Sequence, residues 1–102
     1  MAKYTIHTSE GRLSVRPIAK LEYLGEAFFL HVHHQDRNQV GITHTETGLS
    51  AGRLPRYHGY RAMGMKREAV PKERLLIDAV VHLSRVPEER FRAAMAKARG
   101  EV

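Results

Sequence analysis

Residues 28–33, Phe-Phe-Leu-His-Val-His, and residues 40–45, Val-Gly-Ile-Thr-His-Thr, are the two stretches that decide the fold. Side chains in both alternate with a period of two, which is typical of β-strands with one buried face. The polar residues 35–38 between them favour a turn. We therefore predict a β-hairpin in which Val32 pairs with Ile42. This pairing places Leu30, Val32, Val40 and Ile42 on one face and His31, His33, Thr43 and Thr45 on the other.

A second hairpin is predicted at the beginning of the chain. Residues 3–7 and 12–16 alternate in the same way, and Thr8 to Gly11 supply turn residues. Pairing Ile6 with Leu13 also pairs Tyr4 with Val15, so that all four apolar side chains share one face. The opposite face then carries Lys3, His7, Arg12 and Arg16.

Residues 68–99 have the composition of helices, rich in Ala, Leu, Glu, Arg and Lys. Pro71 suits the first turn of a helix. The apolar residues that follow form one helical stripe, made of Leu75, Leu76, Ala79, Val80 and Leu83. Val86-Pro87 ends that helix, and Glu88 and Glu89 place negative charge at the start of a second one.

Together these patterns predict an α+β fold. We expect a mainly antiparallel four-stranded sheet built from the two hairpins, with both C-terminal helices packed on its apolar face and its polar face in water. A single domain would span residues 1–102, with hairpins in 1–49, a basic connecting loop in 50–67 and helices in 68–99. Residues 21–26 fit no element clearly, and Leu24 to Glu26 are interpreted as a connection.

Composition narrows the function classes. The 102 residues include 17 Lys and Arg against 11 Asp and Glu, which gives a net charge of +6, and there is no cysteine. Disulfide frameworks, thiolate catalysis and zinc knuckles are therefore excluded. No apolar run approaches the roughly 18 residues of a membrane span, and the first residues lack a signal-peptide pattern. We expect a protein of the bacterial cytoplasm without cofactor or membrane association, and a homodimer remains open.

The polar face of the sheet is the first candidate binding surface. It would carry Lys3, Arg12 and Arg16 with His7, His31 and His33, and no carboxylate. Such a surface can neutralise phosphates or dock an acidic protein patch. The alternative is an ordinary solvated face whose charges protect the sheet from aggregation.

The connection at residues 50–67 is the second candidate. Its basic and aromatic residues are Arg53, Arg56, Tyr57, Tyr60, Arg61, Lys66 and Arg67, and residues 53–67 contain no acid. Arginine binds phosphate or carboxylate through its planar fork, and tyrosine offers a stacking plane or an interface anchor. The alternative is a solvated basic loop.

Histidine chemistry is the third possibility. His31 and His33 have a spacing found among metal ligands, but a metal site needs three or four ligands, and the sequence places no others beside them. A small nuclease would use His31 or His33 as the base, an arginine as the phosphate clamp and Glu46 as a partner. No sequence motif fixes these groups at hydrogen-bonding distance.

One part of the sequence resembles a known group of proteins. Leu30 to His33, the polar turn, and the segment Val40 to Leu49 with its Thr-His-x-x-Thr-Gly pattern, followed by Lys66-Arg67-Glu68-Ala69, resemble small uncharacterised proteins of tailed phages and prophages. This sequence departs from the pattern of those phage proteins because it has no tryptophan at the start of the second strand. The resemblance supplies no catalytic residues. It implies an accessory protein that binds host machinery, as anti-CRISPR proteins do.

These observations favour a small basic, non-enzymatic binding protein that engages a host macromolecule or nucleoprotein complex. Direct, sequence-independent binding of DNA or RNA uses the same residues and is the first alternative. A His-dependent nuclease is the second.

Overall fold

The computed structural model describes residues 4–58 and 68–100. Along the chain, the elements are β1 (Tyr4–Thr8), β2 (Gly11–Val15), β3 (Ala19–Tyr23), β4 (Glu26–Val32), β5 (Gln39–His44), β6 (Ser50–Pro55), α1 (Lys72–Ser84) and α2 (Glu88–Ala98). The α+β class is confirmed, as are two C-terminal helices that meet near Val86-Pro87.

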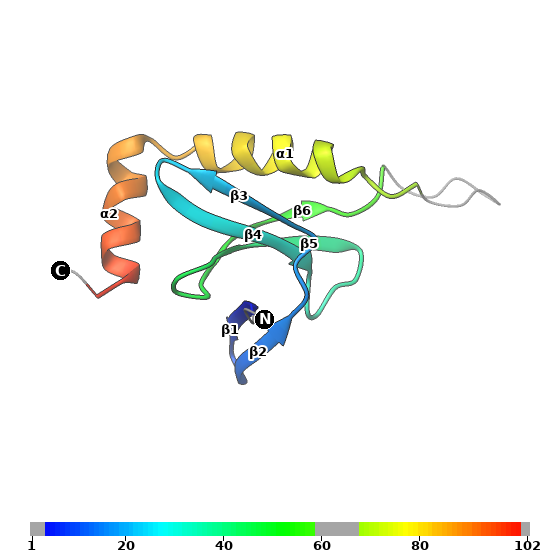
Figure 1. Ribbon diagram of the computed structural model, residues 1–102, viewed down its shortest axis with the longest axis horizontal. Coiled ribbons are helices and arrows are strands. Elements are labelled where there is room, and N and C mark those ends of the chain that lie inside the picture. Colours follow the sequence, from blue (N-terminus) through cyan, green and yellow to red (C-terminus); the bar gives the residue numbers. More distant parts are fainter. Residues whose placement is uncertain (1–3, 59–67, 101–102) are drawn as a thin grey trace.

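The strands form two sheets instead of the single sheet predicted from the two hairpins. β1 and β2 make a two-stranded sheet, and β3 to β6 make a four-stranded antiparallel sheet in sequence order. α1 lies on one side of the larger sheet and the β1–β2 hairpin on the other (Figure 1). The larger sheet is thus a middle layer.

Two strands of the larger sheet lie where no strand was predicted. β3 occupies residues 19–23, and β6 occupies residues 50–55 of the segment expected to be a loop. Both are short, and β6 has a glycine and a proline among its six residues, which hides its alternation. The turn between β3 and β4 consists of Leu24 and Gly25, both with positive φ, as a tight two-residue hairpin turn requires.

The predicted register is right for one hairpin and wrong for the other. Ile6 pairs with Leu13 and Tyr4 with Val15, as expected. In the larger sheet Ile42 pairs with Leu30, whereas Val32 pairs with Val40, a shift of two residues from the prediction. A shift of two preserves the assignment of side chains to faces.

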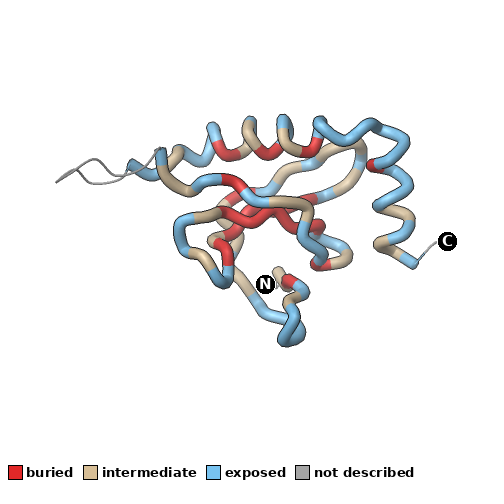
Figure 2. Tube along the Cα trace, turned by 180° about the vertical axis from the view of Figure 1, so that it is seen from behind, coloured by how far each residue is buried: buried red, intermediate tan, exposed pale blue. Residues whose placement is uncertain are grey.

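The apolar face of the larger sheet packs beneath α1. Leu30, Val40 and Ile42 are fully buried there, together with Leu75 and Ala79 of the helix. α2 buries a single residue, Phe91, whose ring lies 5.1 Å from that of Tyr23 and 6.0 Å from that of Phe28, measured between centroids. Of the two helices, α1 therefore contributes most of the cover. The buried residues concentrate in the central strands and on the inner side of α1 (Figure 2).

The opposite face is not in water, contrary to the prediction. His31, His33 and Thr43 are all buried on the side where β1 and β2 lie. The Tyr4 ring packs edge-on against Phe29 at 4.9 Å, and the His7 N–H donates to the Gly48 carbonyl oxygen at 2.8 Å. The hairpin is held against the sheet by these contacts, and it covers the face that the alternation assigned to solvent.

Candidate functional site

Arg53 and Arg56 both donate hydrogen bonds to residues 37–39, where the β4–β5 turn leads into β5, and we call Arg37, Arg53 and Arg56 the arginine surface. Arg53 lies on β6 opposite Gly41 and donates from Nη1 to Gln39 Oε1 at 3.3 Å. Arg56 follows β6 and donates from Nη1 to the Arg37 carbonyl oxygen at 2.9 Å. Arg37 and Arg53 are exposed and Arg56 is half-buried. Sequence reasoning missed Arg37, which stands alone in a polar turn.

Tyr57 supports the arginine surface from one side. Its ring lies 5.4 Å from Arg56 Cζ, a cation–π contact. Tyr57 also forms a β-bridge with Ala69, flanked by hydrogen bonds from the His58 N–H to the Glu68 carbonyl and from the Val70 N–H to the Arg56 carbonyl. The backbone that carries Arg56 is therefore fixed on both sides, because the Arg56 N–H also donates to the Asn38 carbonyl at 2.9 Å.

The charges of the arginine surface are not neutralised within the described part of the chain. The arginines that form ion pairs there are Arg74 with Asp78, Arg92 with Glu88, and Arg99 with Glu26 and Glu46. By contrast, Arg53 and Arg56 donate to an amide oxygen and a carbonyl oxygen. The acid of the β4–β5 turn, Asp36, accepts a hydrogen bond from the Asn38 N–H at 2.9 Å. The guanidinium groups of Arg37, Arg53 and Arg56 thus have no ion-pair partner among the described residues.

The predicted binding residues divide into three groups. Arg53 lies on β6, and Arg56 and Tyr57 lie on its continuation, where a loop was predicted. Arg12 lies on β2 and Arg16 directly follows that strand, and both are exposed. The other predicted residues, Lys3, Tyr60, Arg61, Lys66 and Arg67, lie outside the described residues.

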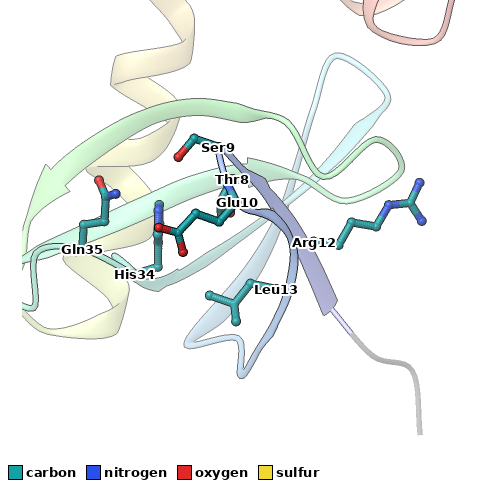
Figure 3. Close-up of a pocket in the computed structure, with 7 residues that line it drawn as sticks. All are labelled: Thr8, Ser9, Glu10, Arg12, Leu13, His34 and Gln35. Carbon is teal, nitrogen blue, oxygen red and sulfur yellow. Dashed lines mark hydrogen bonds between the residues drawn. The ribbon is translucent and has the colours of Figure 1, made fainter.

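The hairpin arginines do not join the histidines on one open face. Arg12 lines a depression of about 320 Å³ between the tip of the hairpin and the β4–β5 turn, which also includes Glu10 and His34. Figure 3 shows that the Arg12 side chain extends away from the other labelled side chains. Since His31 and His33 are buried under the hairpin, the continuous basic sheet face predicted from the sequence does not form.

The buried imidazole of His31 is held in place by hydrogen bonds within the protein. Its Nδ1 lies 3.0 Å from the Val32 carbonyl oxygen and its Nε2 lies 2.8 Å from Thr43 Oγ1. A carbonyl only accepts, so Nδ1 carries the proton and Nε2 accepts from the Thr43 hydroxyl. Burial lowers the pKa of His31 below its ordinary value. Both ring nitrogens are thus engaged by the protein, which counts against a metal-binding role for His31.

His33 closes the β4–β5 turn. Its Nδ1 accepts hydrogen bonds from the backbone N–H groups of Gln35 and Asp36, at 3.1 and 3.2 Å. Burial, followed by the nearby positive charge of Arg53, lowers the pKa of His33. The unprotonated nitrogen therefore holds the turn that carries Arg37.

A second cluster of polar groups joins the end of α2 to the sheet. Ligand-type atoms of Glu26, His44 and Glu46 lie within 4.8 Å of one another. His44 Nε2 lies 2.8 Å from Glu26 Oε1, and His44 Nδ1 lies 2.8 Å from Thr47 Oγ1. Arg99 bonds to both carboxylates. Its guanidinium thus supplies the positive charge that a metal ion would bring, and we interpret the cluster as a clamp on α2.

The hydrogen bonds of this clamp act on the Glu26 carboxylate. Glu26 accepts, so His44 Nε2 donates to it, and His44 Nδ1 shares a hydrogen bond with the Thr47 hydroxyl. Burial alone would raise the pKa of Glu26, but the hydrogen bonds from His44 and Arg99 outweigh it, and the pKa is lowered. The alternation of residues 40–45 puts His44 on the same side of its strand as Ile42, but no local pattern predicts its contact with Glu26, because the two residues are 18 positions apart.

Comparisons with known proteins return no match among protein-family models, curated proteins or solved structures. No helix within residues 4–58 and 68–100 combines the length and apolar character needed to cross a membrane.

Proposed function

We propose that the protein is a non-enzymatic binding module that engages a polyanionic macromolecule through the arginine surface. One observation carries the proposal. Arg53 and Arg56 are hydrogen-bonded to residues 37–39, the segment that carries Arg37, and none of the three arginines forms an ion pair within the described residues. Clustered arginines without acidic partners are suited to bind phosphates or carboxylates.

The backbone beneath these arginines is ordered before any partner arrives. Arg53 lies in the ladder between β5 and β6, and His33 and Asp36 hold the turn that bears Arg37. A pre-ordered surface loses less conformational entropy on binding than a mobile loop does. The net charge of +6 adds a general attraction to polyanions.

The setting of a phage accessory protein, with a host nucleoprotein as target, is part of this proposal. It is supported by the sequence resemblance around residues 30–69 and by the arginine surface, which suits the nucleic acid of such a complex. The geometry offers less support for a His-dependent nuclease. His31 and His33, the expected bases, are buried and hydrogen-bonded to Thr43 and to the β4–β5 turn.

A salt titration tests the proposal. A labelled single strand and a labelled duplex are titrated with the protein between 50 and 200 mM salt (roughly the range over which phosphate contacts are lost). Each phosphate contact contributes about one to the slope of log K against log salt. Changing Arg37, Arg53 and Arg56 to alanine should therefore reduce that slope by about three and weaken binding to all sequences alike.

The matched control removes the same charge from α2 by changing Arg90, Arg92 and Lys97 to alanine. Arg90, Arg92 and Lys97 are exposed, so this control variant should unfold within about 0.5 kcal/mol of the wild type. The arginine-surface variant also loses the hydrogen bond from Arg56 to the Arg37 carbonyl and should be less stable by about 1 kcal/mol, which leaves it folded. If the two triple variants lose affinity equally, only net charge matters and the arginine surface is not the site. If the wild type does not bind either nucleic acid at low salt, a polyanionic nucleic acid is not the partner.

A further inference from the structure

A groove runs between β6 and α1, on the opposite side of β6 from β5. It consists of two adjoining depressions of about 310 and 540 Å³ that share Pro55 and Asp78. Arg53 and Arg85 line the first, with Val81 on the helix wall. One wall is therefore the edge of a sheet and the other is the flank of a helix.

The sheet edge in this groove has backbone groups to offer. β6 is the last strand in its sheet and, among the residues that the structure describes, pairs there only with β5. Just beyond β6, the Arg56 N–H donates to Asn38 on the β5 side. Because peptide groups alternate along a strand, those of Leu54 and Gly52 also face β5, and those of Arg53 and Pro55 face the groove. Proline has no N–H, so the donor on this edge is Arg53 and the acceptors are the carbonyls of both residues.

Just beyond β6, the chain pairs with a segment that precedes α1. Residues 68–70 pair antiparallel with residues 56–58, through hydrogen bonds of 2.9 and 2.8 Å. At the other end of the groove, His82 Nε2 lies 3.2 Å from the Ala51 carbonyl oxygen. The open stretch of edge thus lies between Ala51 and the start of this pairing.

Charge indicates which strand would fit. Arg53 and Arg85 are exposed at the groove, and its acid, Asp78, is paired with Arg74 at 3.1 Å. A second copy that paired its β6 antiparallel to this one would bring two Arg53 side chains near each other, which is unfavourable. The other open edge, β3, alternates Lys20 with Glu22 and has no such preference. The β6 edge is therefore complementary to negative charge.

The geometry points to the groove between β6 and α1 as a site for an acidic peptide segment, which binds in an extended conformation as an added strand beside β6. The site does not depend on the proposed binding of nucleic acid. Its specific residues, Val81 and Arg85, lie outside the arginine surface, and Arg53 is shared. A partner complex that contains both nucleic acid and an acidic protein segment would engage both sites.

The test uses a fluorescein-labelled peptide that alternates Glu and Val, with a Lys-Val peptide as its opposite. Val81→Trp fills the groove without changing charge, and the matched control Val80→Trp lies next to it on α1 but outside the groove. The two valines are 47% and 39% exposed, so both variants should fold. We expect Val81→Trp to raise the Kd of the acidic peptide at least about tenfold and Val80→Trp to leave it unchanged. Arg85→Ala should raise the Kd by about two- to fivefold.

Hydrogen exchange provides the independent measurement. Bound acidic peptide should slow exchange of the Arg53 amide, the donor on the open edge, and the Lys-Val peptide should not. Equal binding of the acidic peptide to both tryptophan variants, or an unprotected Arg53 amide at saturation, would overturn the inference. If single-stranded DNA, instead of the peptide, protects Arg53 and is blocked by Val81→Trp, the groove belongs to a nucleic-acid site. Loss of the DNA salt dependence in the arginine triple variant is a separate result and tests only the proposed function.

Discussion

The two faces of the four-stranded sheet are both buried, but by different chemistry. On the side of α1, Leu30, Val40 and Ile42 form an apolar cluster with the helix. On the side of the β1–β2 hairpin, the buried residues are Phe29, His31 and Thr43. The side chains of His31 and Thr43 share a hydrogen bond of 2.8 Å. Apolar contacts accept many neighbours of similar volume, whereas a buried hydrogen bond needs one partner at one place. The second face is therefore the more specific of the two.

This difference shows what an alternating sequence determines. It assigns side chains to faces, but it does not say what covers each face. His31 is buried because Thr43 supplies a partner and because Gly41 leaves room for the ring. A Cβ atom on Gly41 would lie 2.7 Å from the imidazole, closer than real contacts allow. A histidine at the polar positions of a strand is thus no evidence of exposure.

The largest effect is expected on the apolar face. Ile42→Ala removes a fully buried side chain beneath α1 and should lower the free energy of unfolding by about 2–5 kcal/mol through the cavity it leaves. Urea unfolding followed by circular dichroism measures this loss. Val80→Ala, on the exposed side of α1, is the control and should change stability by less than about 0.5 kcal/mol. A neutral Ile42→Ala would mean that this face of the sheet is not packed as described.

A smaller but more informative effect is expected on the hairpin side. Thr43→Val preserves the shape of the side chain but removes the hydroxyl that donates to His31, so it should cost about 1–3 kcal/mol. Thr45→Val makes the same chemical change at an exposed position and should be nearly neutral. If both variants are equally stable, the hydrogen bond on the buried face does not hold the hairpin layer, and the contrast between the faces disappears.

Local pattern was sufficient for part of the fold. The α+β class, the register of β1 with β2 and the break at Val86-Pro87 follow from period, turn residues and proline. β6 could not be identified in this way, because Gly52 and Pro55 interrupt its pattern and its pairing with β5 is what orders it. The packing of the β1–β2 hairpin against the four-stranded sheet could not be predicted from local pattern either, since either face of a hairpin can be covered.

Local sequence pattern also predicted only part of the candidate site. Arg53, Arg56 and Tyr57 were predicted from the density of basic residues, but Arg37 joins them only through the hydrogen bond from Arg56 to its carbonyl group. Arg99 reaches Glu26 across 73 positions of sequence. Contacts at such separations depend on how helices and sheets are placed relative to each other, and no local spacing encodes them.

The smallest effect that separates the two faces is a pH dependence. The pKa values of His31 and His33 are lowered below the ordinary value of 6.5, chiefly by burial. Above pH 6.5 neither the folded nor the unfolded chain protonates these groups, so they add no pH dependence there. As pH falls below 6.5 the unfolded chain takes up protons that the folded chain does not, and the free energy of unfolding decreases. Urea unfolding at pH 7.5 and 5.5 (on either side of about 6.5) measures this decrease.

His31→Gln tests whether the decrease in the free energy of unfolding at low pH comes from the hairpin side of the sheet. Glutamine cannot take up the proton, so this variant should lose less stability between the two pH values than the wild type does, whatever its stability at pH 7.5. Glu26 does not confuse the result. Its pKa is lowered from 4.5, so the stability that it contributes is lost only as pH falls below that value. An unchanged pH dependence in His31→Gln would show that the buried His31 imidazole is not the group that senses acid.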